Sequence, residues 1–234
     1  MWGAFGLKFP VLYFAAGLGT RMDALTKDRP KPLINVGGRP LLDHALALAD
    51  LSEIGTKVIN IHYRAEMIRA HLAGREVLFS DETDALLETG GGLRKALPLL
   101  GPGPVMTMNT DAVWKGPNPF AILAAHWDPD RMDALLLLLD RDDALGHSGT
   151  GDFLPDADGR LHRGPGLIYS GAQIINPKDL DDIPDPAFSL NLVWDKMIER
   201  GKLFGIRYPG KWCDVGRPNS IPLAEELIED RSAI

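Results

Sequence analysis

An apolar segment that runs directly into a glycine-rich turn constrains this chain more than any other feature. Residues 11–14 read VLYF, residues 15–22 read AAGLGTRM, and residues 29–33 read RPKPL. Glycine lets the backbone approach a ligand closely, and exposed N–H groups at such a turn bind phosphate oxygens. The pattern predicts a cradle for the phosphates of an activated nucleotide, with Arg21 and Lys31 as fixed cations.

The two prolines beside Lys31 make this interpretation specific. Proline fixes its own φ and restricts the residue before it, so Pro30 and Pro32 preset the position of the ammonium group. A glycine pair alone is also typical of a plain strand-to-helix turn. A dinucleotide site is excluded because Met22 replaces its third glycine, and because the second predicted strand ends in Ile61-His62 rather than in an acid.

The composition limits the partners and the compartment. The chain has 234 residues, a net charge of −7 and one cysteine, Cys213. Duplex nucleic-acid binding needs clustered Lys and Arg, which are missing, and no apolar run is long enough to cross a bilayer. The apolar first 17 residues resemble a signal peptide, but their only cation, Lys8, lies in the middle, and cleavage would remove the first strand. We therefore expect a cytoplasmic protein with no nucleic-acid or membrane partner.

Alternating patterns in the first half predict an α/β fold. Short apolar runs separated by helical patterns indicate βαβ units and a Rossmann-like, mostly parallel sheet, with possible mixed pairs, flanked by helices. A helix stop is expected near Gly55. The expected strands are 11–15, 57–61, 76–79 and 105–108, and the expected helices are 40–51, 65–73 and 91–99.

The second half begins with a helix and a buried strand and then changes texture. Residues 140–166 are rich in Asp, Gly, His and Pro, which predicts a loop-rich insertion on the substrate side. Ser189 is the expected N-cap of a helix that ends before Gly201. We expect one domain over residues 1–234, with a nucleotide-binding half of about 9–115 and a sugar-side part of about 116–234. The other expected elements are helices 120–127 and 220–230 and strands 134–139, 167–175, 203–208 and 211–215.

A run of three glycines and two aspartates complete the candidate site. Residues 90–92 open a helical pattern and would expose backbone groups that a base could contact; a flexible loop or an ordinary helix start is the alternative. Asp111 and Asp214 each follow or end a strand-like segment, where ligands of open α/β sheets bind. A lone loop aspartate is usually a turn residue or a cap. Two aspartate carboxylates that lie close together can hold Mg²⁺, which prefers oxygen ligands.

Residues 11–36 resemble the signature of the sugar-1-phosphate nucleotidyltransferases. The segments LETGGG at 87–92, NTD at 109–111 and WCDVG at 212–216 extend the resemblance across nearly the whole chain. It is strongest to a short bacterial subgroup that includes N-acetylmuramate-1-phosphate uridylyltransferases and serves cell-wall sugar metabolism. The resemblance implies a fold of the nucleotide-diphospho-sugar transferase type. It also implies Mg²⁺-dependent transfer of NMP from an NTP, with UTP favoured, to a sugar 1-phosphate.

The resemblance also implies roles for individual residues. Arg21 and Lys31 would be catalytic, and Asp111 and Asp214 would hold the metal. Thr110 stands where the family often has glycine, which puts the identity of the sugar in question more than the reaction. The implied nucleotide-binding residues are Ala15, Ala16, Gly17, Gly19, Thr20, Glu88, Thr89, Gly90 and Gly91. The implied substrate-binding residues are Asn109, Asp152, Ser170 and Gly171.

The implied reaction is an in-line attack at the α-phosphorus. The attacking phosphate oxygen is already ionised, so positioning and charge neutralisation suffice without a general base. Two alternatives stay open: cytidylyl transfer to phosphocholine or another non-sugar acceptor, and a non-catalytic sensor of sugar nucleotides. A sensor does not need two metal carboxylates, which favours the enzyme. The sequence leaves the base, the sugar and the oligomeric state open.

Overall fold

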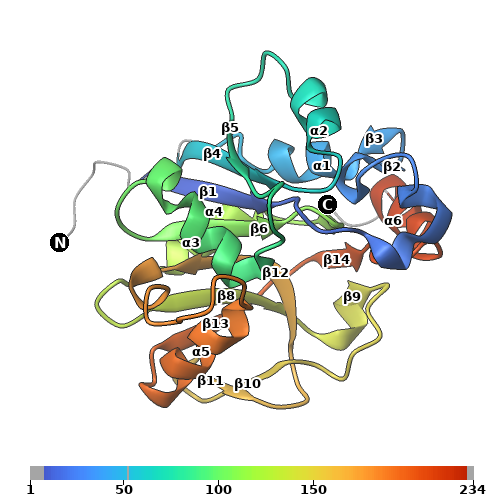
Figure 1. The fold of residues 1–234 in the computed structure, drawn as a ribbon. Coiled ribbons are helices and arrows are strands. Elements are labelled where there is room, and N and C mark those ends of the chain that lie inside the picture. The colour runs from blue at the N-terminus through green and yellow to red at the C-terminus, as the bar shows by residue number, and fades with distance from the viewer. Residues whose placement is uncertain (1–7, 52, 231–234) are drawn as a thin grey trace.

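The structure is a computed structural model that describes residues 8–51 and 53–230 (Figure 1). The expectation about the first 17 residues therefore lies partly outside the described residues. In the described part, the helices are α1 (Leu41–Ala47), α2 (Ala65–His71), α3 (Glu88–Leu100), α4 (Pro119–His126), α5 (Leu190–Glu199) and α6 (Ser220–Glu229).

The longer strands build the main sheet and most of the site. They are β1 (Phe9–Phe14), β4 (Ile54–Ile61), β5 (Leu78–Asp81), β6 (Val105–Asn109), β7 (Ala112–Lys115), β8 (Ala134–Leu139), β12 (Ile168–Ile175), β13 (Leu203–Arg207) and β14 (Lys211–Asp214). The short strands are β2 (Asn35–Val36), β3 (Arg39–Pro40), β9 (Ala144–Leu145), β10 (Phe153–Pro155) and β11 (Leu161–Arg163).

A seven-stranded mixed sheet forms the centre of the molecule. Its strand order is β13-β8-β12-β6-β1-β4-β5, and β12 alone among these runs antiparallel to its neighbours β6 and β8. This confirms the expected α/β fold with a mostly parallel, mixed sheet. β7, β14 and β9 form a second sheet of three strands, in which β14 is the middle strand.

Helices cover both faces of the main sheet because successive strand residues point to opposite sides. Val11 and Tyr13 of β1 pack into one core with residues of α1, α2 and α4, whereas Leu12 packs into a second core with residues of α3 and α5. A third, smaller core joins β7, β14 and α6. Both faces of β1 are thus buried, which holds the turn that follows it on a rigid base.

Most expected helices and strands are present. The main differences concern element boundaries and short strands that depend on pairing with distant segments. α1 ends at Ala47, well before residue 51, and Gly55 lies inside β4 instead of ending a helix. A Cβ at Gly55 would lie 3.6 Å from the carbonyl oxygen of Phe9, which is an ordinary contact distance, so the pairing of β4 with β1 does not require glycine there. The segment 140–166 is not only loop, because β9 joins β14 and β10 pairs with β11.

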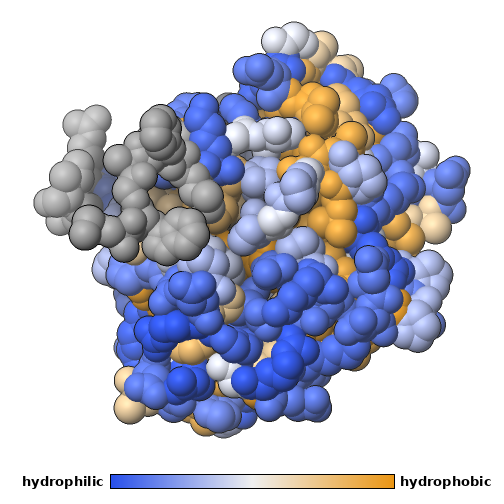
Figure 2. All heavy atoms as spheres, turned by 90° about the vertical axis from the view of Figure 1, so that its left-hand side faces the viewer, coloured by the Kyte–Doolittle hydropathy of each residue, from blue (hydrophilic) through white to orange (hydrophobic). Residues whose placement is uncertain are grey.

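No helix within residues 8–51 and 53–230 combines the length and apolarity that a bilayer crossing requires. Figure 2 shows a face that is mostly hydrophilic, with apolar side chains gathered in one band.

Candidate active site

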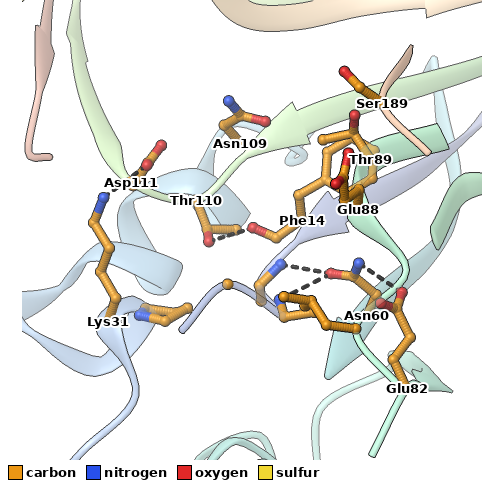
Figure 3. A pocket seen from close by; sticks show the side chains of 15 residues that line it. Phe14, Lys31, Asn60, Glu82, Glu88, Thr89, Asn109, Thr110, Asp111 and Ser189 are labelled. Carbon is orange, nitrogen blue, oxygen red and sulfur yellow. Dashed lines mark hydrogen bonds and ion pairs between the residues drawn. The ribbon is translucent and has the colours of Figure 1, made fainter. Parts of the chain in front are cut away.

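A cavity of about 390 Å³ opens where β1, β4, β5 and β6 end (Figure 3). These four strands are parallel, so their carboxyl ends meet at one edge of the sheet, where ligands of open α/β folds bind. Residues 14–17 line the cavity after β1, Asn60 does so from β4 and Glu82 after β5. Residues 109–111 complete this wall after β6.

Lys31 projects into this cavity from a short 3₁₀ turn, Lys31–Leu33, which begins after Pro30. Its side chain is only 11% exposed, and Nζ lies 2.7 Å from Oδ2 of Asp111. Gly19 makes this position possible, because its φ is +66° and a Cβ there would lie 2.9 Å from Cβ of Lys31. The glycine turn and the Pro-Lys-Pro segment therefore act together, and they bring one buried cation to the predicted carboxylate.

The second sheet brings the two predicted metal carboxylates together. Asp111 lies in the turn between β6 and β7, and Asp214 at the end of β14 pairs with Ala112 at the start of β7. The N–H of Val215 donates to the carbonyl oxygen of Asp111 over 2.8 Å. Burial raises the pKa of the Asp214 carboxyl, and the negative charge of Asp111 raises this pKa further. The two carboxylates are close enough to repel each other.

The donor set fits a hard divalent cation. A cation between Asp111 and Asp214 would relieve their repulsion, and carboxylate oxygens are its preferred ligands. Within the described residues, no group of three or more His, Cys, Asp or Glu could hold a metal. Two protein carboxylates leave most of an Mg²⁺ coordination shell to water and substrate phosphates, which is the usual arrangement at phosphoryl-transfer sites.

Arg21 is not among the residues that line the cavity. It is exposed on the 3₁₀ segment Thr20–Thr26, whose N-cap is Gly19. Its positive charge and that of Lys31 partly offset the rise in the pKa of the Asp214 carboxyl. Thr20 lies beside it and also faces solvent rather than the cavity. The structure thus places Lys31 in the cavity wall, whereas Arg21 reaches the site only through its charge.

Asn60 organises the first part of the glycine turn. Its Oδ1 accepts hydrogen bonds from the N–H groups of Ala15 and Ala16 at 2.6 and 3.2 Å. These two N–H groups are therefore not available to phosphates, although the resemblance implies that Ala15 and Ala16 bind the nucleotide. In the described part of the chain, the N–H groups of Gly17, Leu18 and Gly19 have no acceptor. Backbone donors that a phosphate could use are therefore found only in the second half of the turn.

Gly17 is a glycine that the fold itself does not need. A Cβ placed there would meet no heavy atom within 4 Å, and its φ lies outside the left-handed region. Gly17 lines the cavity and is exposed. The space beside this residue is left open, as the close approach of a ligand to the backbone would require.

The three glycines at the start of α3 do not expose backbone groups, which corrects another expectation. The N–H groups of Gly90 and Gly91 both donate to the carbonyl oxygen of Phe188. A Cβ on Gly90 would lie 2.3 Å from the Phe188 ring. These glycines therefore admit the segment before α5, whereas Glu88 and Thr89 line the cavity.

The predicted substrate residues lie in different parts of the structure. Asn109 lines the main cavity, and Gly171, with φ +86°, leaves room for it, since a Cβ there would lie 2.7 Å from Nδ2 of Asn109. Asp152 lines a smaller, adjoining cavity of about 240 Å³ and accepts a hydrogen bond from the N–H of Tyr169. Ser170 is buried and its hydroxyl donates to the carbonyl oxygen of Leu137, so this hydroxyl already has a partner inside the protein.

Thr110 has a structural partner that explains why the chain departs from glycine. Its hydroxyl donates to the carbonyl oxygen of Phe14 over 2.8 Å and joins the ends of β1 and β6. We expect Thr110→Val, which keeps the shape and removes the donor, to lower the free energy of unfolding by about 1–2 kcal/mol. Urea denaturation measures this change, and Thr56→Val at an exposed position of β4 is the control. Equal stability of both variants would contradict a structural role for the hydroxyl.

The sequence interpretation missed Asn60 and Glu82, which both line the cavity. Asn60 is 2% exposed and interrupts an apolar strand, VINI at residues 58–61. A polar residue inside a buried strand must find a partner, and this is the signal that could have identified it. Glu82 carried no comparable signal, because its burial depends on how β5 and α3 pack.

Nucleophilic catalysis by cysteine or histidine has no support at this site. Cys213 is fully buried and free, and burial together with the charge of Asp214 raises the pKa of its thiol to about 12. His147 is half-buried near Trp212, with ring centroids 6.4 Å apart, and is not among the residues that line the main cavity. The site offers cations, carboxylates and backbone donors.

Comparison with known proteins agrees with this arrangement. The sequence profile of the MobA-like NTP transferase domain matches residues 11–148. The chain is 41% identical to the N-acetylmuramate alpha-1-phosphate uridylyltransferase of Caulobacter vibrioides, over 94% of this chain and 96% of that protein. It is 33% identical to the protein of the same name from Neisseria meningitidis serogroup B, over 92% of this chain and 96% of that protein.

A solved structure agrees on the fold. The putative glucose-1-phosphate thymidylyltransferase from Bacillus anthracis superposes with a TM-score of 0.77 at 18% identity, over 95% of this chain and 96% of that one. An identity this low supports the fold alone, whereas the two uridylyltransferases and the domain profile define the family. The chain belongs to the sugar-1-phosphate nucleotidyltransferases, within the MobA-like NTP transferase domain family.

Proposed function

We propose that this protein is a cytoplasmic, Mg²⁺-dependent enzyme that transfers UMP from UTP to a sugar 1-phosphate and releases pyrophosphate. The acceptor that we propose is N-acetylmuramate 1-phosphate, after the two uridylyltransferases to which the chain is similar over nearly its whole length. The observation that carries the proposal is the Lys31–Asp111 pair at one end of the cavity, with Asp214 beside it.

This pair supports nucleotidyl transfer because charge accumulates on the α-phosphoryl group during the reaction. Lys31 is nearly buried, so its positive charge acts in a medium of lower dielectric than water. Asp111 and Asp214 would hold Mg²⁺, which supplies a Lewis acid for the phosphate oxygens when it is bound. The free N–H groups of residues 17–19 would bind the departing pyrophosphate.

The remaining residues position the two substrates. Asn109 would bind the ribose or the sugar, and the adjoining cavity beside Asp152 has room for the sugar ring. Neither histidine nor cysteine is among the described residues that line the main cavity. A general base is not needed there, because the attacking sugar phosphate oxygen is already ionised. Catalysis then consists of alignment and charge stabilisation.

A screen of pyrophosphate release tests the proposal. UTP, CTP, GTP and ATP are each combined with N-acetylmuramate 1-phosphate, glucose 1-phosphate and phosphocholine, with and without Mg²⁺. We expect release with UTP and N-acetylmuramate 1-phosphate, and only with metal. Release with CTP and phosphocholine would replace the proposal by cytidylyl transfer, and binding of UDP-sugar without release from any pair would indicate a sensor.

A further inference from the structure

The smaller cavity beside Asp152 is lined by side chains that suit a polar organic ligand. It has a volume of about 240 Å³ and contains aromatic rings together with a few polar groups, which is the usual composition of such sites. Thr89 and Ser189 line both this cavity and the main one, and Figure 3 shows them on the side of the main cavity away from Lys31. A molecule held at Lys31 can thus extend past these two residues into the smaller cavity.

Three aromatic rings make the wall of the smaller cavity rigid. The Trp194 ring packs edge to face against Tyr169 and Phe153, with ring centroids 4.9 and 5.9 Å apart. The indole N–H of Trp194 donates to Oε1 of Gln173 over 3.0 Å, and this hydrogen bond is buried. A side chain that packs on these rings is therefore held in a defined position.

Arg163 supplies the positive charge of the smaller cavity. Among the described residues that line either cavity, only Lys31 and Arg163 carry a positive charge. Lys31 pairs with Asp111 at the end where the phosphates would lie. The cation of the smaller cavity lies apart from that pair, so it is available for a second anionic group.

The fold holds the guanidinium group of Arg163 in place. Arg163 on β11 pairs with Phe153 on β10, and its Cζ lies 4.8 Å from the centre of the Phe153 ring. Its Nε donates to Oδ1 of Asp195 over 2.8 Å, and its Nη2 donates to the carbonyl oxygen of Asn191 over 3.2 Å. Within the described residues, Nη1 has no acceptor. Its two N–H groups are therefore free to bind a ligand.

Two carboxylates near Arg163 leave its affinity for a further anion intact. Asp195 is 51% exposed, so water screens its ion pair with Arg163, and exposed pairs of this kind are weak. Asp152 lines the same cavity, and its Oδ2 accepts a hydrogen bond from the N–H of Tyr169. As an acceptor, Asp152 suits the hydroxyl groups of a sugar, whereas Arg163 as a cationic donor suits an anionic substituent. The two side chains together favour a ligand that carries both.

We propose that Arg163 binds a carboxylate group of the acceptor sugar and so selects acidic over neutral sugar 1-phosphates. This inference rests on the proposed function, since it assumes that a sugar 1-phosphate occupies the smaller cavity. The acceptor then carries two anionic groups, its phosphate toward Lys31 and its carboxylate toward Nη1 of Arg163. The lactyl group of N-acetylmuramate provides such a carboxylate, which N-acetylglucosamine lacks. Guanidinium and carboxylate groups form charge-assisted hydrogen bonds that a neutral sugar cannot replace.

Initial rates of pyrophosphate release test this inference, with UTP, Mg²⁺ and three acceptors. These are N-acetylmuramate 1-phosphate, the methyl ester of its carboxyl group, and N-acetylglucosamine 1-phosphate. For the wild type we expect a higher kcat/KM with the acid than with the ester or with the neutral sugar. Arg163→Gln should lower this preference by about 10-fold, mainly through KM, because it removes a hydrogen bond between two charged groups.

Two further variants show whether the charge and its place matter. Arg163→Lys should keep part of the preference for the acid, because it retains the charge but loses the planar pair of donors. Arg160→Gln is the matched control and should leave the preference unchanged. Arg160 precedes β11, stacks on the Phe204 ring and pairs with Asp158, but it lines neither cavity.

Asp195→Asn separates ligand binding from the attachment of β11 to α5. It keeps Arg163 and removes the charge of its partner, so the preference for the acid should stay or rise. A lower preference would show that the attachment to α5 decides and would overturn the inference. An unchanged preference in Arg163→Gln, or an equal kcat/KM of the wild type for the acid and its ester, would also overturn it and leave nucleotidyl transfer intact. No release by the wild type with any acceptor would reject the proposed function itself.

Discussion

Lys31→Ala should lower kcat of nucleotidyl transfer by about 10²- to 10³-fold, which is the usual cost of removing one preorganised group that stabilises transition-state charge. The Nζ of Lys31 lies 2.7 Å from Asp111 and is shielded from solvent, so a water molecule or a bulk cation would replace it poorly. The effect should fall mainly on kcat, because the charge that Lys31 meets is largest in the transition state. Initial rates of pyrophosphate release measure it.

Two comparisons separate catalysis from folding in this experiment. Lys57→Ala removes a lysine from the first half of β4, away from the carboxyl end of this strand where the site lies. Lys57 lines a different cavity, so this variant should leave kcat unchanged. Both variants should have a Tm near that of the wild type in thermal unfolding. The Asp111 side chain is 30% exposed, so water can solvate it when Lys31 is removed. Full turnover in a folded Lys31→Ala variant would remove Lys31 from the mechanism.

Asp111→Asn should lower kcat by about 10²-fold or more and shift the Mg²⁺ titration of the remaining activity to higher concentration. Asparagine keeps the shape of the side chain but loses the charge that would hold the cation together with Asp214. The same change also breaks the ion pair with Lys31, so both effects contribute to the loss. Rates measured over a series of Mg²⁺ concentrations separate weaker metal binding from slower chemistry at saturation.

The double variant Lys31→Ala with Asp111→Asn tests how the two groups cooperate. If they act as one unit, its kcat should lie close to that of the slower single variant, because effects within a catalytic unit are not additive. Asp158→Asn, in the exposed turn between β10 and β11, is the control for a lost carboxylate charge. An unchanged Mg²⁺ titration for Asp111→Asn would remove Asp111 from the metal site.

Local signals in the sequence identified the part of the site that one continuous segment forms, from β1 to Lys31. The strand before the turn, the glycine at residue 19 and the prolines around Lys31 are all local devices, and each has the expected place in the structure. The glycines at 90–92 misled the interpretation, because their reason is the approach of Phe188, a residue almost a hundred positions away. Local patterns do not reveal which distant segment fills the space that a glycine leaves.

The sequence by itself determined the α/β class, the glycine turn with Lys31, and the family, because these depend on short-range pattern and residue type. Only the tertiary structure decided which groups face one another. The pairing of β14 with β7 brings Asp214 to Asp111, and Asn60 takes up the N–H groups of Ala15 and Ala16. The burial of Glu82 behind α3 is of the same kind. Charge repulsion, hydrogen bonding and desolvation depend on distances in space, and the order of residues along the chain does not contain them.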